Sequence, residues 1–99
     1  MRLSQQHREA ILQVVSDTCG PDSQVRLFGS RVDDSQRGGD VDLLIEVPVD
    51  PDDVFGLQRR LYARLLRVLD ERPVDVLVVG PRTRRAAVHV EALRHGVLL

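Results

Sequence analysis

The chain has 99 residues, with 14 basic and 15 acidic side chains and a formal net charge of −1. This near balance excludes an acidic disordered chain, and it provides no overall charge that would draw the protein to nucleic acid or to a membrane surface. With a single cysteine, a polar N-terminus and no long apolar run, we expect one small cytoplasmic domain over residues 1–99 without a disulfide.

Apolar periodicity predicts a helix and then two strands in the first half of the chain. The helix covers 4–19, with Ser4 as its N-cap and Gly20 as its end. Alternation of apolar and polar residues predicts strands at 24–28 and 40–47. The second strand has an apolar face and a mainly acidic face, formed by Val41, Leu43, Ile45 and Val47 and by Asp40, Asp42, Leu44 and Glu46.

The second half is expected to add a helix, a strand and a last helix. The helix over 52–69, capped by Asp52 or Asp53, has an apolar stripe with arginines mostly outside it. Residues 74–79 are nearly all apolar, which predicts a central strand, and a helix over 83–95 follows. Its inward residues are expected to be Ala87, Val88, Val90 and Leu93. This order predicts an α+β domain, with helices packed on a small mixed β-sheet in two layers.

The first strand runs into a turn, Gly29-Ser30. Glycine lets a ligand approach the backbone closely, and the amides after Ser30 can point at an anion. An ordinary turn at the end of a strand is the alternative interpretation.

Three aspartates fall on predicted strands. Asp40 and Asp42 share one face and repel each other unless a cation is present, and a hard divalent cation with oxygen ligands removes that conflict. A solvent-facing polar edge is the alternative. Asp75 lies in an apolar strand, and it joins this pair if its strand lies beside 40–47. Three carboxylates near an anion-binding turn are suited to phosphoryl chemistry assisted by two metal ions.

The stretch LFGSRVDDSQRGGDVDLLIEV, followed by PVDVLVV, resembles the minimal nucleotidyltransferase (MNT) domains of the DNA polymerase β superfamily. The resemblance implies the polymerase β-like nucleotidyltransferase fold and a reaction in which a hydroxyl attacks an α-phosphate and pyrophosphate leaves. It implies that Gly29 and Ser30 hold the nucleotide triphosphate. Arg31 and Arg37 flank this loop, where they can contact phosphates, and solvated surface arginines are the alternative. The resemblance also implies that Asp40, Asp42 and Asp75 bind Mg²⁺ and carry out catalysis.

Free-standing domains of this size are similar to the antitoxin half of HEPN–MNT toxin–antitoxin pairs. This similarity implies transfer of AMP from ATP to a tyrosine of a partner HEPN toxin. One alternative is an antitoxin that neutralises its partner by binding alone. Another is transfer to a small molecule such as an aminoglycoside, which the expected absence of an acceptor domain disfavours. Candidate docking surfaces are the Arg-rich face of helix 52–69, Tyr62, and the tail 97–99, for which a final short strand is an equal alternative.

Cys19 and the three histidines are assigned structural roles. Cys19 lies at a predicted helix end with no base near it, so we expect a small buried apolar residue and not a nucleophile. His7, His89 and His95 lie far apart in the sequence, without the spacing of metal ligands.

Overall fold

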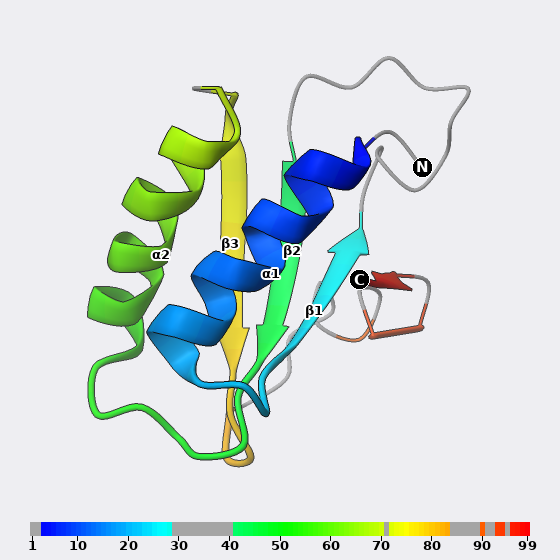
Figure 1. The fold of residues 1–99 in the computed structure, drawn as a ribbon. Coiled ribbons are helices and arrows are strands. Elements are labelled where there is room, and N and C mark those ends of the chain that lie inside the picture. The colour runs from blue at the N-terminus through cyan, green and yellow to red at the C-terminus, as the bar shows by residue number, and fades with distance from the viewer. Residues whose placement is uncertain (1–2, 29–40, 71, 84–89, 91–92, 95) are drawn as a thin grey trace.

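In the computed structural model, the described part of the chain forms two helices on one face of a four-stranded sheet (Figure 1). The described residues are 3–28, 41–70, 72–83, 90, 93–94 and 96–99. In chain order the elements are α1 (Gln5–Cys19), β1 (Gln24–Phe28), β2 (Val41–Glu46), α2 (Val54–Val68), β3 (Val74–Val79) and β4 (Val97–Leu98). The predicted α+β architecture is confirmed.

α1 begins at the predicted cap and ends at the predicted glycine. The Ser4 side chain accepts a hydrogen bond from the backbone N–H of His7 at 3.0 Å, which satisfies one of the free donors of the first turn. Gly20 has a φ of 98°, a value that side-chain-bearing residues rarely adopt, so the chain can turn away there. Ile11 and Val15 are buried, and they fix which face of α1 meets the sheet.

α2 has the strongly amphipathic pattern that its sequence predicts. Of the two candidate caps it is Asp53 that accepts a hydrogen bond from the Gly56 N–H, at 2.9 Å. Leu57, Leu61 and Leu65 are buried at helical spacing. The arginines lie outside this stripe and are exposed; they are Arg59, Arg60, Arg64 and Arg67.

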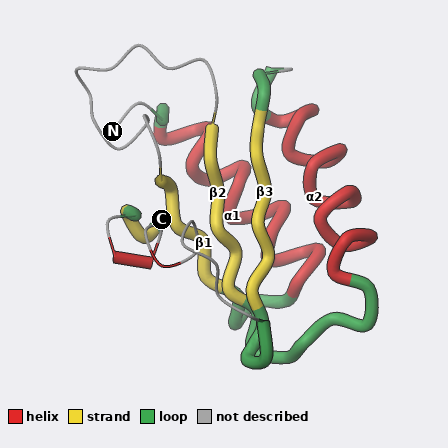
Figure 2. The backbone as a smooth tube through the Cα atoms, turned by 180° about the vertical axis from the view of Figure 1, so that it is seen from behind, coloured by secondary structure: helices red, strands yellow, loops and turns green. Residues whose placement is uncertain are grey.

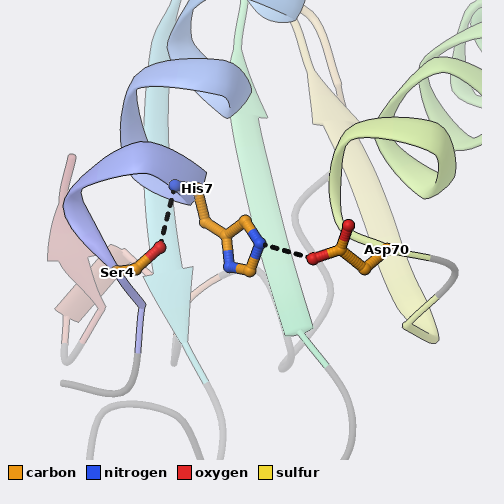
Figure 3. Close-up of polar contacts among 3 residues, drawn as sticks. All are labelled: Ser4, His7 and Asp70. Carbon is orange, nitrogen blue, oxygen red and sulfur yellow. Dashed lines mark hydrogen bonds and ion pairs between the residues drawn. The ribbon is translucent and has the colours of Figure 1, made fainter.

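A polar contact joins the beginning of α1 to the end of α2. The Nε2 atom of His7 lies 3.1 Å from Oδ2 of Asp70, as Figure 3 shows. Asp70 has a φ of 58°, the left-handed conformation in which helices often end and which aspartate tolerates better than most residues. The contact gives His7 a structural role. His89 and His95 lie outside the described residues.

The sheet has the strand order β3-β2-β1-β4. β1 is antiparallel to β2 and β4, whereas β2 and β3 are parallel and connected through α2. Figure 2 shows the sheet from the side opposite α1 and α2.

The prediction that residues 74–79 form a central strand is wrong, because β3 lies at the edge of the sheet. Its apolar composition has another cause. Val74 and Val78 are buried in the main core that α1 and α2 form with the sheet, while Val79 is buried with Leu44 on the opposite face. β3 is apolar because side chains on both of its faces are buried, although it forms backbone hydrogen bonds with a neighbouring strand, β2, along only one edge.

The C-terminal part differs from the prediction in one respect. The expected helix 83–95 falls mostly outside the described residues, Ala87 and Val88 included. Of its described residues Val90, Leu93 and Arg94 are helical, whereas Thr83 is not, and its hydroxyl accepts a hydrogen bond from the Gly80 N–H. Leu93 packs against Leu44 and Val79 as expected, but Val90 is 44% exposed. The apolar patch on this face is small, and of these two described residues only Leu93 contacts it.

The tail forms the short final strand that was one of its two alternatives. β4 pairs with β1, and the Leu99 N–H donates to the Val25 carbonyl at 2.8 Å. None of the described helices is long and apolar enough to cross a membrane.

The core between helices and sheet contains Leu61 of α2, which has no exposed surface. We expect Leu61→Ala to lower the free energy of unfolding by about 2–5 kcal/mol, because it removes buried methyl groups and leaves a cavity. Leu98→Ala is the matched control, since Leu98 is 50% exposed and should cost less than about 1 kcal/mol. Chemical denaturation measures both, and equal losses would contradict this assignment of the core.

Candidate functional site

Carboxylates of two parallel strands meet at one end of the sheet. The register pairs Asp42 of β2 with Asp75 of β3. Directly paired residues of parallel strands point to the same face, and neighbouring strands lie about 4.8 Å apart. Asp42 and Asp75 therefore lie side by side, on the face opposite α1 and α2. The sequence made this juxtaposition conditional on the strand 74–79 lying beside 40–47, and β3 does lie beside β2.

The hydrophobic pattern of β2 holds Asp42 in this position. Val41 and Leu43 have no exposed surface and belong to the core beneath the helices. Since side chains alternate along a strand, Asp42 must point to the other face. Asp42 is half-buried there, whereas Asp75 is exposed. The pair is thus open to a ligand on the β3 side.

β1 ends at the same end of the sheet. Its last residue, Phe28, pairs with Asp42 across the antiparallel ladder, so Phe28, Asp42 and Asp75 form one row across three strands. The predicted triphosphate-binding residues Gly29, Ser30 and Arg31 follow Phe28 in the sequence, and the third predicted carboxylate, Asp40, comes two residues before Asp42. All four lie outside the described residues.

The rest of this face carries an apolar cluster and an ion pair. In the next row Leu44 pairs with Leu77, and both belong to an apolar cluster with Phe28 and Leu93. Arg26 of β1 pairs with Leu44 in this same row, and its Nε donates to Oε1 of Glu46 in the row beyond at 2.9 Å. Sequence reasoning missed this ion pair, because it joins diagonal neighbours whose contact depends on the register of β1 against β2.

The oxygen atoms of the paired aspartates are suitable ligands for a hard divalent cation. Asp42 and Asp75 offer carboxylate oxygens, the ligands that Mg²⁺ prefers. Among the described residues no three His, Cys, Asp or Glu side chains lie close enough to hold a metal ion. The third predicted ligand, Asp40, is outside that part of the chain.

Comparison with known families agrees with this geometry. A family model described as a nucleotidyltransferase domain matches residues 6–97, which include both paired aspartates. The chain belongs to the nucleotidyltransferase domain family. This membership confirms the resemblance drawn from the sequence. A comparison with curated proteins finds no match.

The nucleotidyltransferase fold leaves Cys19 away from the carboxylates, at the far end of α1 and partly buried. Burial raises the pKa of the Cys19 thiol, and the nearby Arg60 guanidinium offsets this shift only in part. The thiolate is the reactive form, so a raised pKa makes this cysteine a poor nucleophile near neutral pH.

We expect iodoacetamide to alkylate Cys19 in the folded protein at least several-fold more slowly at neutral pH than in the unfolded chain. The rate should rise as the pH passes above the usual cysteine range, because the raised pKa delays formation of the thiolate. Intact mass against time, with and without denaturant, measures this. Equal rates in the two states would contradict it.

Proposed function

We propose that this protein is a Mg²⁺-dependent nucleotidyltransferase that transfers AMP from ATP to a tyrosine hydroxyl of a HEPN-type toxin and so acts as its antitoxin. The pairing of Asp42 with Asp75 on the face of the sheet opposite α1 and α2 is the observation that supports this proposal most. Family membership supports nucleotidyl transfer in general, and the resemblance of the 27–47 motif to MNT domains supports the narrower assignment.

In this proposal the carboxylates have distinct roles. Asp42, together with Asp40 and Asp75, holds the divalent cation, which when bound offsets the negative charge on the phosphates. Asp75 is the more exposed of the described pair, and it also accepts the proton of the attacking hydroxyl. The hydroxyl oxygen forms a bond to the α-phosphorus, the bond from that phosphorus to the bridging oxygen breaks, and pyrophosphate leaves. Gly29, Ser30 and Arg31 hold the triphosphate.

The accessibility of Asp75 supports a large acceptor. Because β3 is an edge strand and Asp75 is exposed on it, a side chain on the surface of another protein can reach this carboxylate without entering a deep cavity. A tyrosine on a protein partner fits such an open site.

Binding of metal and nucleotide should stabilise the fold. We expect Mg²⁺ or Mn²⁺ together with ATP to raise Tm by several degrees, since a ligand at about 100 times its Kd adds about 2.7 kcal/mol. Asp42→Asn should abolish the shift because it removes a charged ligand of nearly the same shape. Asp52→Asn is the matched control, being exposed and separate from the site. An unchanged Tm in the unaltered protein would refute the site.

The transfer itself is tested with the partner toxin, α-labelled ATP and Mg²⁺. We expect label and one or more added AMP masses on a toxin tyrosine, and a loss of at least about a hundredfold in rate for Asp42→Asn. Asp52→Asn should keep the rate of the unaltered protein. If Asp42→Asn still neutralises the toxin fully while transferring nothing, neutralisation rests on binding alone. Label on an aminoglycoside without any protein acceptor would instead identify a small-molecule transferase.

A further inference from the structure

A groove runs between α2 and the outer edge of β3. Its volume is about 270 Å³, and it is lined by Phe55, Gln58, Arg59 and Tyr62 from α2 and by Val74, Asp75 and Val76 from β3. Figure 1 shows α2 lying beside β3, at this side of the sheet. Phe55 is 69% exposed and Tyr62 is 45% exposed. Two exposed aromatic side chains at one groove are typical of an interaction surface.

β3 presents unpaired peptide groups along the groove. The Val79 carbonyl accepts its hydrogen bond from the β2 side, and peptide groups alternate along a strand, so those of Val74, Val76 and Val78 point outward. Gln58 covers one of them, with its Oε1 accepting from the Val78 N–H at 3.0 Å. Among the described residues, nothing pairs with the outward groups of Val74 and Val76. Such an edge can accept an added strand.

The charge of α2 indicates which kind of strand fits. The helix contains four arginines and no acidic residue, and Arg59 lines the groove itself. An acidic segment is therefore favoured beside Arg59. Asp75 also lines the groove, although its side chain is directed to the face of the sheet opposite α2.

A second copy of this chain fits the groove less well. Pairing two β3 edges about a two-fold axis places the two α2 helices side by side. Their arginines would then repel one another with no acidic residue of α2 between them.

We propose that this groove binds an extended, acidic segment of a protein partner, which adds a strand to β3 at Val74 and Val76. Acidic side chains of the segment face Arg59, and an apolar side chain packs on Phe55 and Tyr62. Identification of this segment with the acceptor protein rests on the proposed function, whereas the binding itself does not.

The test is selection of displayed random peptides on the intact protein, without nucleotide or divalent cation, so that its outcome concerns the groove and not the transfer reaction. We expect enriched peptides in which Asp or Glu alternates with aromatic or aliphatic residues. Methylation of alternate backbone amides in a selected peptide should abolish binding, because it removes the donors that pair with β3.

Anisotropy of a labelled selected peptide then locates the site. Arg59→Gln and Phe55→Ala should each weaken binding about tenfold, as expected for the loss of one charged or one aromatic contact. Arg67→Gln is the matched control, because it removes the same charge from an exposed position of α2 that does not line the groove. Its binding should change by less than about twofold.

Four outcomes would overturn the proposal. They are the absence of enriched peptides, enriched peptides without acidic residues, equal losses for Arg59→Gln and Arg67→Gln, and binding that survives amide methylation. Arg59-dependent binding of a single-stranded RNA oligonucleotide without peptide binding would assign the helix to nucleic acid instead. A dimer in sedimentation that Phe55→Ala dissociates would assign the groove to a second copy.

Discussion

Burial of one face of β2 is the constraint on which the candidate site depends. Val41, Leu43 and Ile45 have no exposed surface, and they pack beneath both helices. A shift of β2 by one residue would turn Asp42 and Glu46 into this core, where unpaired charges cost several kcal/mol each. The apolar side chains thus hold Asp42 on the face opposite the helices, and the parallel register with β3 places Asp75 beside it. The carboxylates are positioned by hydrophobic packing and not by any attraction between them.

Features set by local periodicity could be predicted from the sequence. α1, α2 and the first three strands fall within about two residues of their expected positions, because each needs only its own alternation and its own caps. The pairing of Asp42 with Asp75 could also be anticipated, since two strands joined through a helix tend to lie parallel and adjacent. The functional roles of Asp42 and Asp75 stay predictions, as do those of Gly29, Ser30, Arg31 and Asp40.

Features set by long-range packing could not be predicted. An apolar strand such as β3 is equally consistent with the centre of a sheet and with an edge that is covered on both faces. The exposure of Phe55 becomes meaningful only when α2 is placed beside the edge of β3, which no pattern within α2 determines. The same holds for Arg26 and Glu46, which meet only in the observed register.

The two edges of the sheet are not equivalent. On the β1 side the chain covers its own edge, because β4 pairs with β1 and the Leu99 N–H bonds to Val25. Any sequence joined after Leu99 therefore departs from the side of the sheet opposite the groove. A fusion partner or a surface linkage can therefore be attached at the C-terminus, at the edge of the sheet away from β3. Asp75 and the free edge of β3 stay accessible to solvent.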